Sequence, residues 1–179
     1  MTCCDIERIE NVLTGLQTDE PLPCVKCSHH SKAVSRRTVL VMVKPEFLEE
    51  ALNGTYRFCE ARECPIVYFE EQGTRTFTVD DLRIIVGIKS SADPIPLCYC
   101  FGFDESHLRK EIAQTGTTTI PEKISHLTRE GLCACDVCNP SGKCCLGEVN
   151  RTAKRLMLEA VDQMQRPGEF LWTLNFILR

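Results

Sequence analysis

The distribution of cysteine is the feature that most constrains how this chain can fold. Thirteen of its 179 residues are cysteines, and all of them stand in closely spaced groups. The groups are Cys3 with Cys4, Cys24 with Cys27, Cys59 with Cys64, Cys98 with Cys100, and a run that contains Cys133, Cys135, Cys138, Cys144 and Cys145. The first residues show no basic segment followed by an apolar one, so we expect a cytoplasmic protein whose thiols stay reduced. In that compartment, grouped cysteines favour metal ligation over disulfide bonds.

Composition and motifs exclude several classes of protein. The formal net charge is -4, which argues against a broad nucleic-acid-binding surface. No apolar run reaches the roughly 18 residues that a membrane span requires. The sequence has no glycine-rich phosphate loop, no HExxH zinc motif and no serine nucleophile elbow. We therefore expect a protein that is not an enzyme and has no membrane span.

Polar and proline-containing segments divide the chain, and together the parts predict an α+β fold. Runs rich in β-branched and aromatic residues predict strands over 38–43, 55–59 and 65–72, with one or two more over 75–88. Pro45 favours the start of a short helix that the Asn53–Gly54 pair stops. The expected organisation is an N-terminal helix and linker (1–22), a small, mostly β zinc-binding unit (23–89), a helical unit (97–165) and an apolar C-terminal tail (166–179).

Three helices are predicted in the second unit. Asp104 can cap a first helix that Gly116 ends. Thr119 and Glu122 have the spacing of a capping box before a second helix that ends at Gly131. The third helix covers 146–165 and presents a helically spaced apolar face, formed by Val149, Ala153, Leu156 and Ala160.

The pairs Cys24-x-x-Cys27 and Cys59-x-x-x-x-Cys64 predict a structural zinc site. Both pairs stand at turns between predicted strands, and such spacings let both sulfurs of a pair face one tetrahedral ion. A unit of this size buries little apolar surface, so a bound zinc would supply stability that the core lacks. The alternatives are four buried thiols without metal, a disulfide, and a zinc site in which His29 or His30 replaces one cysteine ligand.

The Cys98-x-Cys100 pair predicts part of an iron–sulfur site. Two thiolates one residue apart can reach a single iron at a turn, and the helix that follows points amide donors at an anionic cluster. About 33 residues later the cysteine-rich run leads into another helix. Which of its five cysteines would complete the site is open on these grounds.

Several stretches resemble a known family. The second half resembles the bacterioferritin-associated ferredoxin (BFD) fold, a helical module that carries a two-iron, two-sulfide (2Fe-2S) cluster. More specifically, residues 23–149 resemble the N-terminal portion of the CopZ-type copper chaperones, which carries one zinc and one 2Fe-2S cluster. The matching stretches are "PCVKC", "FCEARECPIVYF", "LRIIVGIK", "PIPLCYC" and "NPSGKCC".

The resemblance implies a ligand set for the cluster. Transferred by position, the loop ligands are Cys135, four residues before Asn139, and Cys145, the second cysteine of the following pair. The cluster ligands would then be Cys98, Cys100, Cys135 and Cys145, and the zinc ligands Cys24, Cys27, Cys59 and Cys64. Cys133 and Cys144 remain alternative ligands. Strong turn residues from Asn139 to Gly142 allow the ends of the loop to meet.

The function expected from these residues is one-electron transfer or the handling of copper, with a redox or metal-trafficking protein as partner. The residues after Val149 contain no cysteine, so they do not supply the Cys-x-x-Cys copper module of those chaperones. The thiols outside both sets (Cys3, Cys4, Cys133, Cys138 and Cys144) are candidates for a soft ion such as Cu(I). The alternative is a structural adaptor in which both sites hold zinc and the surface binds a protein.

Overall fold

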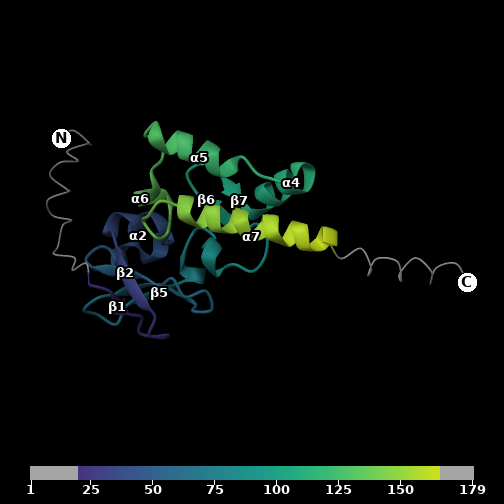
Figure 1. Cartoon of the computed structure of the whole chain (residues 1–179). Coiled ribbons are helices and arrows are strands. Elements are labelled where there is room, and N and C mark those ends of the chain that lie inside the picture. Colours follow the sequence, from purple (N-terminus) through teal and green to yellow (C-terminus); the bar gives the residue numbers. More distant parts are fainter. Residues whose placement is uncertain (1–19, 166–179) are drawn as a thin grey trace, which may run out of the picture.

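A computed structural model of the chain describes residues 20–165, and it shows an α+β fold in which a small antiparallel sheet lies beside a group of helices (Figure 1). The α+β class predicted from the sequence is confirmed. The predicted N-terminal helix, Cys3, Cys4 and the predicted C-terminal tail lie outside the described residues.

The sheet contains five short strands that pair antiparallel in the order of the chain. They are β1 (Leu22–Pro23), β2 (His30–Val34), β3 (Tyr56–Phe58), β4 (Ile66–Glu70) and β5 (Thr76–Thr78). The connections β1–β2 and β3–β4 are turns, and each of them carries one of the cysteine pairs. Because Phe58 pairs with both Lys32 and Tyr68, the register places these two turns at the same end of the sheet.

The prediction of a strand over 38–43 is wrong, because this segment forms helix α2 (Arg36–Met42). The Ser35 side chain accepts a hydrogen bond from the backbone N–H of Thr38 at 3.1 Å and so caps the helix. Thr38, Val39 and Met42 then bury one face of α2 in the core of the first unit. Burial of that face decides the conformation against the β preference of the threonine and valine side chains.

The rest of the first unit consists of short turns of helix. A 3-10 turn, η1 (Pro45–Phe47), leads into α3 (Leu48–Ala51), as the sequence predicted. Over 75–88 only β5 is a strand, because Asp81 accepts hydrogen bonds from the N–H and hydroxyl of Thr78 and turns the chain into η2 (Val79–Asp81). An isolated bridge from Val43 to Leu82 and a last turn, η3 (Gly87–Lys89), follow.

The second unit begins with a two-stranded hairpin and continues as helices. The hairpin is formed by β6 (Pro96–Cys98) and β7 (Phe103–Asp104), and the helices are α4 (Glu105–Thr115), α5 (Ile120–Arg129), α6 (Cys135–Cys138) and α7 (Leu146–Gln165). Asp104 caps α4, and Gly116 ends it with a φ of 76°, both as predicted. The core contains Leu108, Ile112, Ile120, Ile124, Val149, Ala153 and Leu156.

Helix α5 does not use the predicted capping box. Thr119 is its N-cap residue, but the Thr119 side chain makes no capping hydrogen bond. The carboxylate of Glu111, which lies on α4, accepts the Thr119 N–H at 2.8 Å and the Thr118 hydroxyl at 2.7 Å. A neighbouring helix therefore supplies the negative charge at the start of α5.

Within residues 20–165, none of the helices combines the length and apolar character that crossing a membrane requires.

Candidate metal centres

The first two cysteine pairs lie on two tight turns at one end of the sheet. In the β1–β2 turn, the Cys24 N–H donates to the His29 carbonyl at 2.9 Å, and the Ser28 N–H donates to the Cys24 carbonyl at 2.9 Å. Ser28 adopts a left-handed φ of 59°, which closes this turn around Cys27. In the β3–β4 connection, the Cys59 N–H donates to the Val67 carbonyl at 2.9 Å.

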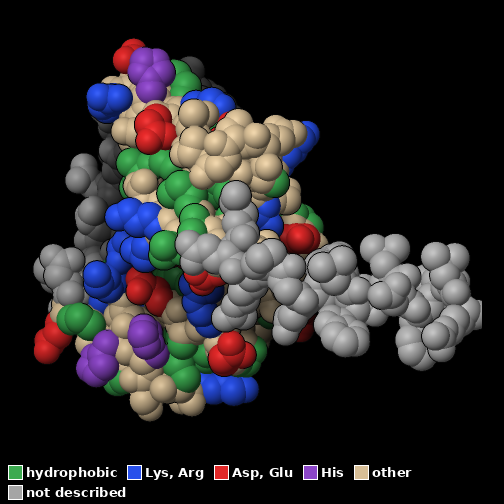
Figure 2. Space-filling view, turned by 45° about the vertical axis from the view of Figure 1, so that its right-hand side comes forward, with side chains coloured by type: hydrophobic (Ala, Val, Ile, Leu, Met, Phe, Trp, Pro, Cys, Tyr) green, Lys and Arg blue, Asp and Glu red, His purple; other side chains and the backbone are tan. Residues whose placement is uncertain are grey.

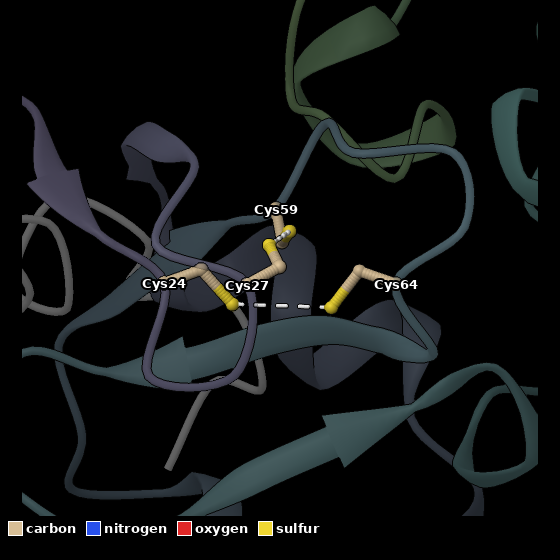
Figure 3. A group of neighbouring side chains, drawn as sticks. All are labelled: Cys24, Cys27, Cys59 and Cys64. Atoms are coloured by element: carbon tan, nitrogen blue, oxygen red, sulfur yellow. Dashed lines mark hydrogen bonds between the residues drawn. The ribbon is translucent and has the colours of Figure 1, made fainter.

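The four sulfurs of these pairs face one another (Figure 3). All of them lie within 4.8 Å of each other, with Cys24 Sγ 4.0 Å from Cys64 Sγ and Cys27 Sγ 3.6 Å from Cys59 Sγ. A tetrahedral zinc with Zn–S bonds of about 2.3 Å requires sulfurs roughly 3.8 Å apart, and these separations are close to that value. Among the described residues, these four are the only group of cysteine, histidine or acidic side chains that converges in this way.

Burial makes this group of thiols suited to a cation. Cys24, Cys59 and Cys64 are buried beside Ile66 and Phe69, whereas Cys27 is exposed. Burial raises the pKa of Cys59 to about 12 and also raises the pKa of Cys64. Without a cation Cys59 and Cys64 therefore keep their protons, and a bound metal would replace those protons as the source of positive charge.

A lysine side chain contacts one of the two cysteine turns. The Lys89 Nζ donates to the carbonyls of Ala61 at 2.7 Å and Cys64 at 3.0 Å, so a positive charge lies against the Cys59–Cys64 turn. No pattern in the sequence indicates this contact, because Lys89 lies 25 residues from Cys64. The side chains of His29 and His30 are exposed and lie outside the group of four sulfurs.

The second predicted set of cysteines meets as two pairs. Cys98 ends β6, Cys100 follows in the hairpin turn, Cys135 begins α6, and Cys145 directly precedes α7. Cys100 Sγ lies 3.7 Å from Cys135 Sγ, and the side chains of Cys98 and Cys145 are hydrogen-bonded to each other. Each pair combines one cysteine of the hairpin with one of the later loop, so the structure brings together all four residues.

This arrangement differs from that of the first group. The four sulfurs do not all converge within 4.8 Å, as a single tetrahedral ion would require. Two separate pairs are what a cluster with two metal atoms needs, because each iron of a 2Fe-2S cluster takes two thiolates. The residues present therefore fit a cluster with two iron atoms better than one zinc ion.

At this second site, hydrogen bonds from backbone and thiol groups favour the thiolate form of Cys98. The hydrogen bond from the Cys145 thiol, together with smaller contributions from the N–H groups of Phe101 and Cys100, lowers the pKa of Cys98 to about 6 against the opposing effect of burial. The Ala134 N–H donates to Cys100 Sγ at 3.4 Å. Burial raises the pKa of Cys135 to about 12. Cys98 therefore ionises readily, whereas Cys100, Cys135 and Cys145 keep their protons in the absence of a cation.

Three further cysteines lie near this site. Cys133 and Cys138 are half-buried, and Cys144 is exposed. They belong to no group of converging ligands among residues 20–165. The copper-binding role considered for Cys3 and Cys4 falls outside the described residues.

The first unit matches a known protein family. Residues 22–83 match the family of CopZ zinc-binding domains, which is described as "Zinc binding domain". The chain contains a CopZ-type zinc-binding domain. The four converging sulfurs all lie within the matched residues.

The similarity extends beyond this domain. The chain is 35% identical over 129 residues to the copper chaperone CopZ of Archaeoglobus fulgidus, an alignment that covers 72% of this chain and 60% of that protein. It is also similar to the crystal structure of the N-terminal domain of Archaeoglobus fulgidus CopZ, with a TM-score of 0.58 and 31% identity. That match covers 73% of this chain and 96% of the solved domain, so it includes residues C-terminal to the zinc-binding domain.

The surface shown in Figure 2 carries basic, acidic and hydrophobic side chains interspersed with one another. A mixed surface of this kind agrees with the small net charge of the chain, -4.

Proposed function

We propose that this chain is a two-centre metalloprotein that carries zinc on Cys24, Cys27, Cys59 and Cys64 and a 2Fe-2S cluster on Cys98, Cys100, Cys135 and Cys145. The zinc-binding family and the tetrahedral spacing of the first four sulfurs support the zinc centre. One observation supports the second centre. The two cysteine-bearing loops meet as two close sulfur pairs, Cys100 with Cys135 and Cys98 with Cys145.

The proposed role is the transfer of single electrons to a redox or metal-trafficking protein, without catalysis of a covalent step. The cluster would supply a one-electron couple. The chain's own residues would hold the anionic group among buried thiols and backbone N–H donors, which lie in the hairpin, at Ala134 before α6 and at Cys145 before α7. Because a relative is a copper chaperone, we extend the proposal to electron or ion transfer in copper handling. Competition titration with a Cu(I) chelator tests this extension.

The metal content of the purified protein tests the two-centre proposal. Protein purified anaerobically, or reconstituted with iron and sulfide, is expected to be red-brown and to contain two irons, two sulfides and one zinc per chain. A colourless protein that binds two zinc ions after reconstitution would instead support the structural adaptor with two zinc sites.

Two cysteines of α6 provide a matched pair of variants. Cys135→Ser should abolish the visible spectrum of the cluster or shift it, because serine replaces a proposed ligand. Cys138→Ser, three residues away on the same short helix, should leave the spectrum unchanged. If only Cys138→Ser bleached the protein, the ligand assignment would be wrong.

A further inference from the structure

The loop that carries two of the proposed cluster ligands lies against the zinc-binding unit. We call residues 133–145 the cysteine loop. In Figure 1 its helix, α6, lies next to α2 of the first unit, and the hydrogen bonds between the units agree. The hydroxyl of Tyr68, on β4, donates to the carbonyl of Pro140 at 2.7 Å, and the hydroxyl of Thr38, on α2, donates to the carbonyl of Asp136. The first unit therefore contacts the loop between Cys135 and Cys145.

The turn at the centre of the loop has a defined shape of its own. The Asn139 side chain accepts the Ser141 N–H at 3.1 Å and donates to the Lys143 carbonyl at 2.7 Å. Gly142 has a φ of 66°, and a Cβ added there would lie 3.4 Å from side-chain atoms of Thr38 and Val34. These local bonds fix the shape of the turn, but only contacts from outside it can fix where it lies.

Tyr68 is suited to provide such a contact. Its side chain is fully buried, and its ring packs on Phe58 with the ring centroids 6.0 Å apart. Burial raises the pKa of Tyr68 well above its ordinary value, so the hydroxyl keeps its proton and remains a donor. An unpaired buried carbonyl or hydroxyl is costly, so the Tyr68–Pro140 bond favours one position of the turn.

The other ligand-bearing loop is held in a similar way. Tyr99 stands between Cys98 and Cys100, and its hydroxyl accepts the Gly87 N–H at 2.8 Å and donates to the Ile85 carbonyl at 3.2 Å. Two residues after Gly87, Lys89 contacts the Cys59–Cys64 turn. Both the hairpin and the cysteine loop, which together carry the second set of cysteines, are thus hydrogen-bonded to the zinc-binding unit.

We propose that Tyr68 is a positioning residue for the second thiolate site: its hydroxyl holds the turn from Asn139 to Gly142 and so sets how Cys135 and Cys145 meet Cys100 and Cys98. This inference rests on the proposed 2Fe-2S centre. It makes the zinc-binding unit the platform on which the cluster ligands are arranged, in addition to a metal site in its own right.

Two tyrosines of the same sheet allow a matched test. Tyr56 and Tyr68 are both fully buried, and both donate to a backbone carbonyl, but the Tyr56 bond to Glu50 at 3.3 Å stays within the first unit. The variants Tyr68→Phe and Tyr56→Phe each remove one hydroxyl. Both should keep one zinc per chain. Only Tyr68→Phe should alter the visible circular dichroism of the reconstituted cluster and release iron faster under a chelator, by roughly three- to tenfold for one hydrogen bond.

A second measurement needs no cluster. In the zinc-loaded, cluster-free protein, the amide hydrogens of Cys138, Asn139 and Gly142 are bonded within the loop and report its order. Their exchange should be faster in Tyr68→Phe than in Tyr56→Phe. Thr38→Val removes the other hydrogen bond from the first unit to the loop and should also speed the exchange of these amides. It replaces Tyr68→Phe in this test if that variant does not fold.

The outcomes separate the two proposals. If the wild-type protein takes up no iron and sulfide, the proposed cluster fails, and faster exchange in Tyr68→Phe would still support the positioning of the loop. If the wild-type protein forms the cluster but the two tyrosine variants match in dichroism, iron release and exchange, the role of Tyr68 is overturned.

Discussion

At the residue scale, Gly87 shows how closely the two units approach each other. A Cβ at this position would lie 1.9 Å from the carbonyl oxygen of Pro96, which is a backbone atom and cannot rotate away. Pro96 begins β6, the strand that ends at Cys98. The absence of a side chain at residue 87 therefore allows the proposed cluster hairpin to contact the end of the first unit.

We predict that Gly87→Ala destabilises the protein by about 1–3 kcal/mol, the usual cost of overpacking. Gly147→Ala is the control, because a Cβ there meets only Arg151 at 3.7 Å and the residue lies in α7. It should change stability by less than about 1 kcal/mol and raise it if anything. Urea unfolding followed by far-ultraviolet circular dichroism measures both, and equal effects would contradict the steric argument.

At the scale of elements, α4 and α5 depend on each other through Glu111. The Lys123 Nζ donates to the Glu111 carboxylate at 2.9 Å, and Thr118 and Thr119 donate to the same group. Lys123, followed by Thr118 and Thr119, lowers the pKa of Glu111 to about 2. The ionised carboxylate therefore joins the two helices and compensates the positive end of α5.

We predict that Glu111→Gln destabilises the protein by about 0.5–1 kcal/mol, since Lys123 is exposed and Glu111 is only half-buried. A lowered pKa in the folded state contributes stability that is complete above the pKa of the unfolded chain, about 4.3, and is lost as the pH falls toward 2. The loss of unfolding free energy caused by Glu111→Gln, measured by urea unfolding, should therefore be the same at pH 7 and at pH 5. Glu130→Gln, at the exposed end of α5, is the control and should leave stability unchanged or slightly higher. A loss that halves between pH 7 and pH 5 would contradict the assignment.

At the scale of the whole molecule, the first unit has a small core of its own. Its strands are two to five residues long, and its cysteine turns enclose a separate cluster with Ile66 and Phe69. Residues 40 positions apart, Cys24 and Cys64, meet in that cluster. A metal ion that joins the two turns would add the stability that so short a sheet lacks.

We predict that zinc stabilises the folded protein by about 4 kcal/mol when free zinc exceeds the dissociation constant about 1,000-fold. Thermal unfolding with and without a zinc chelator measures this difference. Cys59→Ser should lose most of the stabilisation, whereas Cys144→Ser, which replaces an exposed thiol, should behave like the wild-type protein. Equal melting temperatures with and without the chelator would contradict a structural zinc.

Local signals in the sequence predicted much of this fold. Asp104 and Gly116 predicted the start and end of α4, and the apolar spacing within 146–165 predicted the buried face of α7; the structure confirms both. The same reasoning failed where a distant partner decides. The β-branched residues 38–43 form α2 because the core buries one face of them, and the start of α5 takes its cap from Glu111 of another helix.

The sequence by itself determined which cysteines stand on turns and how far apart the members of each pair can be, because pair spacing and turn residues act over a few neighbouring positions. Only the tertiary structure decided which sulfurs meet across 40 or 35 residues, and that the cysteine loop rests on Tyr68 and Thr38. Those contacts follow from strand register and from the packing of one unit on the other. No local pattern along the chain encodes either of them.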